Sequence, residues 1–373
     1  MYTQRNPSID VLRGIAILLV LGAHFPCYDI WTRIGWTGVN LFFVLSGFLV
    51  SGLLFDSLQR SGSVQARRFF VRRGFKIWPS FYCFMAFYAF VALLQTGPYP
   101  SRVVIDAASF IQNYTGISDE ILTSHIWSLC VEEHFYLLLP LLFLAGTYFL
   151  NSNAPHAIAI LAALSLPICL LLRLRVAQDG QGIHQSHLLF DTLLFGVLLS
   201  YLYRFQRERF RLLSSTPFAV AGIVCLTPML LGSRDSWFVQ TIGVTSGSIG
   251  FGLLLCWAVG RWPANLFAST ALRGLSRIGF YSYPIYLWHL MVRLVVLACF
   301  GSHLLGFWAY VAGSVALGAM VTQLIEQPFL RLRDRLFPGQ AVVFPANSAA
   351  FTRETVHATP VLASVSRHPS NPA

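Results

Sequence analysis

The sequence predicts an all-α polytopic membrane protein with about ten transmembrane helices and both termini in the cytoplasm. Hydrophobic residues make up 55% of the 373 residues and charged residues only 11%, and the mean hydropathy is +0.62. These values lie outside the range of ordinary soluble domains. Apolar stretches long enough to cross a bilayer follow one another along the chain. Basic residues gather in alternate connections between these stretches, as they do in cytoplasmic loops.

About ten stretches have the length and apolarity of a membrane span, although several are short or interrupted by glycine. They comprise residues 11–27, 37–55, 78–94, 135–150, 157–172, 188–203, 218–231, 239–259, 281–300 and 304–325. The connections after every second stretch hold most of the basic residues: Arg60, Arg67, Arg68, Arg72, Arg73 and Lys76, then Arg204, Arg207, Arg209 and Arg211, then Arg261, Arg273 and Arg277, and finally Arg331, Arg333 and Arg335. The opposite connections contain few, chiefly Arg33, Arg102, Arg173, Arg175 and Arg234. This asymmetry places both termini on the cytoplasmic side.

One membrane domain is expected over residues 1–337, with no second soluble domain. Residues 338–373 are rich in Pro, Ser, Ala and Thr and lack a periodic apolar pattern, which predicts a disordered cytoplasmic tail. The longest connection on the opposite side covers residues 95–133. It includes a half-apolar stretch, residues 103–111, which either re-enters the membrane or lies along its surface. We expect an external acceptor to dock at this connection.

Charge and cysteine spacing exclude several other classes. The net charge of +11 and the pI near 9.6 do not predict nucleic-acid binding, because the arginines lie mostly in short loops between apolar stretches. The seven cysteines stand singly in apolar runs, a spacing that predicts neither disulfides nor a metal site. No small-residue cleavage site follows the first apolar stretch, so we expect that stretch to be retained.

The first apolar stretch carries two ionisable residues, Arg13 and His24. Eleven residues on a helix bring His24 back to nearly the same face as Arg13, ~16 Å further along the axis. Ionisable groups within a membrane are costly and usually functional. The alternative is that Arg13 extends to the surface beside Asp10 while His24 faces water at the end of the helix.

A basic stretch lies between the second and third apolar stretches and includes Arg72, Arg73 and Lys76. Guanidinium groups match the geometry of phosphate, so these residues are candidates for holding a phosphorylated ligand from the cytoplasm. The alternative is attraction to anionic lipids together with the setting of topology.

Two adjacent carboxylates, Glu132 and Glu133, stand between His125 and His134. A carboxylate can orient an imidazole base, and Glu132 shares a helical face with Tyr136 at i, i+4 spacing. Complementing the helix dipole is the alternative role for the carboxylates.

The aromatic stretch at residues 281–289 fits an interfacial belt. His289 lies deeper in the span than those aromatic residues and is a second candidate for the site.

These blocks together resemble the membrane-bound acyltransferase 3 family, whose bacterial members O-acylate surface polysaccharides, lipopolysaccharide and related acceptors. The matching blocks are DVLRGIA at residues 10–16 followed by His24, GVNLFFVLSGFL at 38–49, RRGFKIWP at 72–79, WSLCVEEHFY at 127–136 and YPIYLWH at 283–289. Three positions depart from the family pattern: Lys76 where arginine is usual, Asn40 where aspartate is frequent, and His134 where glutamine is frequent.

The resemblance implies a multi-pass O-acyltransferase of the bacterial inner membrane. It would move an acyl group, chiefly acetyl, from cytoplasmic acyl-coenzyme A to a hydroxyl of an envelope carbohydrate or glycolipid, with no permanently bound cofactor. His24 would act as general base or as a transient acyl carrier, Arg13 would stabilise charge or hold the donor, and Glu132 would orient His24 or the acceptor. The residues implied for donor binding are Arg72, Arg73, Lys76 and Ser46, and those implied for the acceptor or for support are Glu133, Tyr136, Trp127 and His289.

A transporter or flippase for a lipid-linked sugar is the alternative. It would use the same ionisable residues as a proton or ligand pathway and would need no coenzyme A. Such proteins often contain an internal repeat, and none is visible in the sequence.

Overall fold

The computed structural model describes residues 6–96, 101–115, 122–177 and 183–338, and in these residues it is helical throughout, without strands. The helices are α1 (Pro7–Ala23), α2 (Asp29–Ile34), α3 (Thr37–Ser61), α4 (Ala66–Thr96), α5 (Ser101–Ala108), α6 (Gln112–Thr115), α7 (Trp127–Leu150), α8 (Ala154–Val176), α9 (Ser186–Phe205), α10 (Arg207–Leu213), α11 (Thr216–Leu231), α12 (Val244–Arg261), α13 (Thr270–Phe280), α14 (Ser282–Phe300), α15 (Leu304–Val321) and α16 (Gln327–Leu336). Two π-helical turns, η3 (Val239–Gly243) and η5 (Thr322–Glu326), adjoin α12 and α15. The predicted all-α class is confirmed.

Seven helical stretches of the described chain are long and apolar enough to cross a membrane. The count rises to eight if the bent pair α10 and α11 is taken as one span. One of the seven covers both α7 and α8, and α1 and α11 have only 17 and 16 residues. The count of about ten spans therefore stays a prediction, as does the cytoplasmic placement of both termini.

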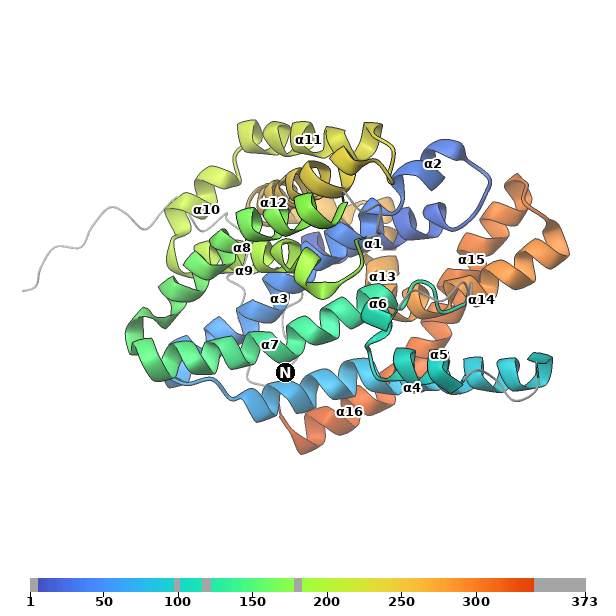
Figure 1. The fold of residues 1–373 in the computed structure, drawn as a ribbon, viewed down its shortest axis with the longest axis horizontal. Helices are drawn as coiled ribbons and strands as arrows, with labels where there is room; N and C mark the ends of the chain where they lie inside the picture. The colour runs from blue at the N-terminus through green and yellow to red at the C-terminus, as the bar shows by residue number, and fades with distance from the viewer. Residues whose placement is uncertain (1–5, 97–100, 116–121, 178–182, 339–373) are drawn as a thin grey trace, which may run out of the picture.

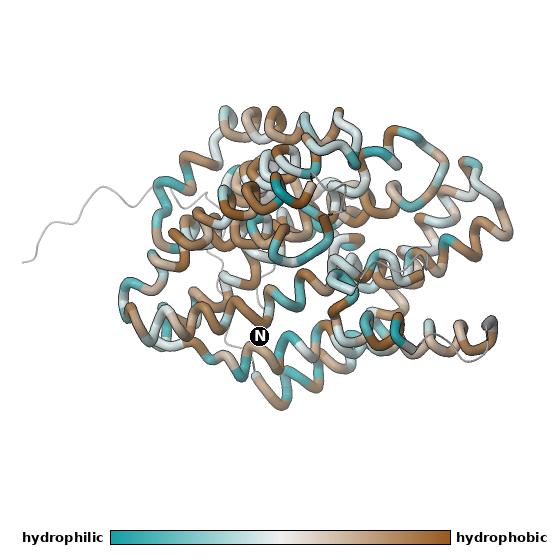
Figure 2. The backbone as a smooth tube through the Cα atoms, viewed as in Figure 1, coloured by the Kyte–Doolittle hydropathy of each residue, from teal (hydrophilic) through white to brown (hydrophobic). Residues whose placement is uncertain are grey.

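Apolar side chains cover the outside of the bundle as well as its core. On α8, Ile160, Leu164, Ile168 and Leu171 form a stripe at helical spacing, and each is at least half exposed. Figure 2 shows hydrophobic residues along most helices and hydrophilic residues mainly near helix ends and loops. A solvent-exposed apolar stripe of this kind is expected where a helix faces lipid.

The central helices α1 and α3 lie between α4 and α16 on one side and α11 and α12 on the other (Figure 1). Close contacts at glycine hold them in place. A Cβ at Gly279 of α13 would lie 1.8 Å from the Asp10 carbonyl oxygen of α1, and one at Gly47 of α3 would lie 1.9 Å from the Leu193 carbonyl oxygen of α9. Such close backbone approach is typical of packed membrane helices. This close packing fixes the positions of α1 and α3 in the bundle, and therefore the positions of Arg13 and Ser46.

The half-apolar stretch at residues 103–111 forms most of α5 and the turn after it, and it packs against α4. Phe110 stacks on Phe81 with ring centroids 4.3 Å apart, and Tyr82 donates a hydrogen bond to the Ala108 carbonyl. The predicted tail lies, from residue 339 onward, outside the described residues.

Candidate active site

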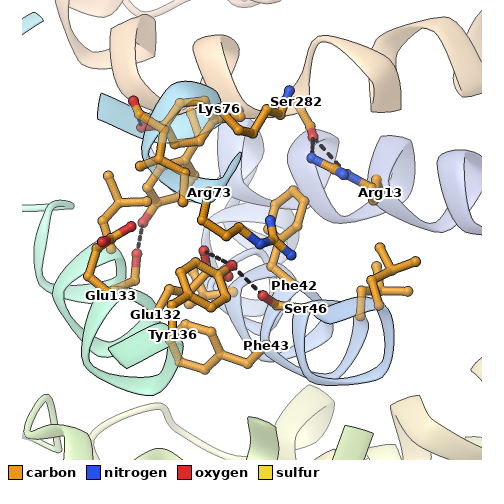
Figure 3. Close-up of a pocket in the computed structure, with 18 residues that line it drawn as sticks. Arg13, Phe42, Phe43, Ser46, Arg73, Lys76, Glu132, Glu133, Tyr136 and Ser282 are labelled. Carbon is orange, nitrogen blue, oxygen red and sulfur yellow. Dashed lines mark hydrogen bonds between the residues drawn. The ribbon is translucent and has the colours of Figure 1, made fainter. Parts of the chain in front are cut away.

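A cavity with about 880 Å³ of space, part of it open to solvent, lies where α1, α3, α4, α7 and α14 meet (Figure 3). Its polar lining consists of Arg13, Ser46, Arg73, Lys76, Ser128, Glu132, Glu133, Tyr136, Ser282, Tyr283 and Tyr286. Five separate helices supply these side chains, so only the tertiary fold creates the cavity.

Arg13 is held at the wall of the cavity by Ser282, the first residue of α14. The Nε and Nη2 atoms of Arg13 donate to the Ser282 hydroxyl at 3.2 and 3.0 Å. Ser282 is in place because the chain breaks at Tyr281, between α13 and α14, and α13 packs closely on α1. The guanidinium thus meets a neutral partner and retains its full charge toward the cavity.

A hydrogen-bonded chain from α7 to α3 lies opposite Arg13. Tyr136 donates to the Glu132 carboxylate at 3.1 Å, as the i, i+4 spacing predicts, and Ser46 lies 2.5 Å from the Tyr136 hydroxyl oxygen. The Arg73 guanidinium covers the Tyr136 ring at 4.8 Å (Figure 3). This cation–π contact does not use the N–H donors of Arg73, and its buried Nε has no hydrogen-bond partner in the part of the chain that the structure describes.

The three basic residues predicted to hold phosphate have different surroundings. Lys76 forms an ion pair with Glu326, which is buried in the π-helical turn η5. Arg72 pairs with Asp334 of α16 at 3.1 Å and also donates to the Phe337 carbonyl, and it does not line the cavity. Arg73 is the member of this set that faces the cavity without an ion pair in the described part of the chain.

Glu133 also lines the cavity. One of its carboxylate oxygens accepts a 3.5 Å hydrogen bond from the Trp78 indole, and the other is buried without a partner among the described residues. Trp127 lies elsewhere, between the rings of Phe43 and His184 at 6.3 and 4.8 Å. Trp127 therefore does not belong to the cavity that holds the other predicted residues of α7.

His24, His289 and His125 form a second cluster at the opposite end of α1. Their rings meet in series, with centroids 4.9 Å apart for His24 and His289 and 5.1 Å apart for His289 and His125. His289 and His125 are buried, and His24 is half-buried. The His24 Nδ1 atom donates to the Val20 carbonyl at 2.8 Å, since a carbonyl can only accept. The Nε2 atom of neutral His24 therefore carries a lone pair and can accept a proton.

Tyr286 and Ser128 stand between the cavity and the histidine cluster. Both line the cavity, and their hydroxyl oxygens lie 2.5 Å apart. Tyr286 also donates to the His125 carbonyl at 2.9 Å, and its ring lies 5.3 Å from that of His125 and 5.8 Å from that of His289. Burial of His125, in the connection before α7, lowers its pKa to about 3. His125 is therefore neutral at physiological pH.

The structure places Arg13 and Glu132 around one cavity, but it does not bring His24 to them. His24 lies ~16 Å from Arg13 along α1, and in the described residues no hydrogen bond joins it to Glu132. Glu132 instead accepts from Tyr136. The predicted orientation of His24 by Glu132 is thus not seen in this conformation, because the two residues line different ends of the central helices.

Sequence reasoning did not assign four residues to the site or its surroundings: Ser282 and Tyr286, which line the cavity, Glu326, which pairs with Lys76, and Arg293, which follows His289 by one turn on α14. For two of them a signal was present. Arg293 interrupts the apolar stretch at residues 281–300, and Glu326 follows directly after the stretch at 304–325. A third residue, Tyr286, lies inside the matching block at residues 283–289. Ser282 carries no such signal, because serine is an ordinary residue at the end of a membrane span.

An apolar helical bundle with a charged cavity at one end of α1 and a histidine cluster at the other end defines a polytopic membrane protein with an interior polar site. Ionisable groups placed in this way are typical of membrane proteins that act on polar ligands. The chain belongs to the acyltransferase 3 family, because it matches the family described as "Acyltransferase domain" over residues 6–322. The resemblance noted in the sequence is confirmed.

The curated relatives are O-acetyltransferases by name. The chain is 24% identical to O-acetyltransferase OatA of Staphylococcus aureus (strain MRSA252), over 95% of this chain and 61% of the relative. It is 23% identical to a putative O-acetyltransferase of S. aureus (strain COL), over 87% of this chain and 57% of that protein. The chain thus spans about three fifths of the length of these relatives. No solved structure matches it.

Proposed function

We propose that this protein is a bacterial inner-membrane O-acetyltransferase. It moves an acetyl group from cytoplasmic acetyl-coenzyme A to a hydroxyl of an envelope carbohydrate or glycolipid. Membership of the acyltransferase family and the names of the relatives support the reaction class. The observation that carries the proposal is that α1 connects two clusters. Among the described residues, one holds Arg13 and Arg73 without an ion pair, and the other holds an imidazole whose Nδ1 atom is bonded to the Val20 carbonyl and whose Nε2 atom has no hydrogen-bond partner.

The cavity at Arg13 and Arg73 is the proposed donor site. Neither arginine has an ion pair among the described residues, so both can meet the coenzyme A phosphates with charge-assisted hydrogen bonds. Lys76 would join them by exchanging Glu326 for phosphate. Ser46 and Tyr136 keep the Glu132 carboxylate hydrogen-bonded, which limits its repulsion of the incoming phosphates.

His24 is the proposed general base at the other end of α1. Its Nε2 atom takes the proton from the acceptor hydroxyl as the hydroxyl oxygen attacks the thioester carbonyl carbon. The carbon–sulfur bond then breaks, and the coenzyme A thiolate leaves and takes up the proton from Nε2. The hydrogen bond from Nδ1 to Val20 holds the required tautomer. The flexible pantetheine arm of the donor would extend past Tyr286 and Ser128 to reach His24.

Transfer of radiolabel tests the proposal. Membranes containing the protein, supplied with acetyl-labelled coenzyme A, should label envelope glycans, and His24→Ala should reduce this labelling by about 10²-fold or more, as expected for loss of a general base. His156→Ala is the matched control, because His156 is exposed on α8 and away from both clusters. Normal labelling by a well-expressed His24→Ala variant would contradict the assigned role. Wild-type membranes that label no glycan would instead favour a transporter.

A further inference from the structure

The end of α1 that holds His24 contains buried polar atoms that have no hydrogen-bond partner among the residues that the structure describes. They include the Nε2 atom of His289, the Nε atom of Arg293 and the hydroxyl of Tyr310. His289 and Tyr310 are fully buried side chains. Buried polar groups are almost always hydrogen-bonded in proteins, so a group of orphaned ones indicates that a ligand completes the site.

These orphaned groups converge on His24. The His289 ring lies 4.9 Å from the His24 ring, and Arg293 follows His289 by one turn on the same face of α14. Tyr310 of α15 stacks at 5.1 Å on Phe25, the residue after His24. The charge of Arg293 acts on both His24 and Tyr310.

Arg293 is half-buried and, like Arg13 and Arg73, differs from the cations of the bundle that have a carboxylate partner. Arg173 is paired with Asp191 at 2.6 Å, Arg204 is paired with Asp56 at 2.6 Å, and Lys76 is paired with Glu326. Arg293 has no carboxylate partner in the described part of the chain. Within an apolar helix such an unpaired guanidinium is costly unless an anion from outside the chain neutralises it.

The local charge also favours an anion. Within the described part of the chain, Arg293 and Arg234 are the charged side chains that act on His24, and both are positive. The orphaned groups of Arg293 and Tyr310 are hydrogen-bond donors. His289 provides an acceptor, because its Nδ1 atom donates to the Tyr286 carbonyl at 2.6 Å and leaves a lone pair on Nε2. The site therefore offers donors for a negative group beside an acceptor for a hydroxyl.

We propose that Arg293 and Tyr310, beside His24 and His289, bind a negatively charged group of the acceptor, either a carboxylate or a phosphate. The acceptor is then an acidic glycan or a phosphorylated glycolipid, and its charge fixes which hydroxyl lies against His24. This inference rests on the proposed function for the identity of the ligand as acceptor.

Binding to matched saccharides tests the proposal. The full chain in nanodiscs of zwitterionic lipid is titrated with a neutral glucose trisaccharide, the same trisaccharide ending in glucuronate, and the same trisaccharide carrying a phosphate. We expect one or both anionic probes to bind at least about tenfold more tightly than the neutral one, as for a charge-assisted hydrogen bond. Comparing the glucuronate probe with the phosphate probe shows whether the site prefers a carboxylate or a phosphate.

Variants of Arg293 assign the preference to this side chain. In Arg293→Gln the anionic and neutral probes should bind with equal affinity, so that the ratio of their affinities falls to about one. Arg293→Lys keeps the positive charge and should retain part of the preference for the anionic probe. Because the ratio is taken within each preparation, it does not depend on the folded fraction. Arg33→Gln is the matched control, since Arg33 is an exposed cation on α2, just after His24, and should leave the ratio at its wild-type value.

Three results would overturn the proposal: no measurable binding of either anionic probe, equal affinity for neutral and anionic probes, or an unchanged ratio in Arg293→Gln. An anionic lipid that copurifies with the wild type and is lost in Arg293→Gln would also overturn it, because it would assign the charge to a lipid headgroup. Absence of acetyl transfer together with an intact anionic preference would refute the proposed function alone.

Discussion

Replacing Arg73 by glutamine removes the one cation of the basic stretch that faces the cavity unpaired among the described residues. The guanidinium covers the Tyr136 ring at 4.8 Å, and no described residue forms a hydrogen bond with its buried Nε atom. In the protein without donor, Arg73→Gln loses chiefly the cation–π contact, which is worth about 0.5–2 kcal/mol. The fold should therefore tolerate this change.

The free-energy cost of Arg73→Gln should be larger when the acyl donor is bound. Charge-assisted hydrogen bonds contribute about 1.5–3 kcal/mol each. Since about 1.4 kcal/mol corresponds to a factor of ten, one such bond to a phosphate predicts that Arg73→Gln weakens coenzyme A binding by roughly 10- to 150-fold. Arg67→Gln should bind coenzyme A as the wild type does, because Arg67 is exposed on the same helix and does not line the cavity.

Isothermal titration of the detergent-solubilised protein with coenzyme A measures the difference directly. Coenzyme A lacks the acetyl group, so this affinity reports on the phosphate contacts and not on the reaction. If Arg73→Gln binds coenzyme A with wild-type affinity, the assignment of the donor site is refuted. If Arg67→Gln loses as much affinity as Arg73→Gln, the effect is one of general surface charge and not of a specific phosphate contact.

Two further predictions concern buried ion pairs. Lys76→Met leaves the Glu326 carboxylate unpaired and should lower the free energy of unfolding by about 3–5 kcal/mol, whereas the double variant with Glu326→Gln should recover much of this loss. Thermal unfolding of the solubilised protein measures both, and a double variant as unstable as the single one would contradict the reasoning. Asp191→Asn should destabilise by a similar amount, because both partners of the Arg173–Asp191 pair are fully buried. Asp106→Asn is its control and should have an effect below about 1 kcal/mol, since its partner is largely exposed, so equal melting temperatures for the two variants would refute the structural role of the buried pair.

Local features of the site follow from sequence spacing. The hydrogen bond between Glu132 and Tyr136 is predicted by their i, i+4 separation and is present in α7. The placement of Arg13 and His24 on one helix follows from the apolar run that contains them, although α1 ends at Ala23, just before His24. Such features involve one helix and its regular geometry, so no knowledge of the packing is needed.

Partners distant in the sequence could not be predicted in the same way. Lys76 and Glu326 are separated by 250 positions, and Arg13 and Ser282 by 269. Which residues meet depends on the rotation and depth of each helix, and these are set by close backbone contacts such as that of Gly279 with Asp10. The basic stretch illustrates the consequence, because packing against η5 and α16 engages Lys76 and Arg72 and leaves Arg73 facing the cavity.

The sequence by itself determined the all-helical membrane class, the family, and the residues of α1, α4 and α7 that carry charge. These properties depend on composition, on order along the chain and on helical periodicity. Only the tertiary structure decided that the charged residues divide into two clusters, with Arg13 and Glu132 in one and His24 in the other. The physical reason is that side chains from different helices meet only where the packing of those helices brings them together.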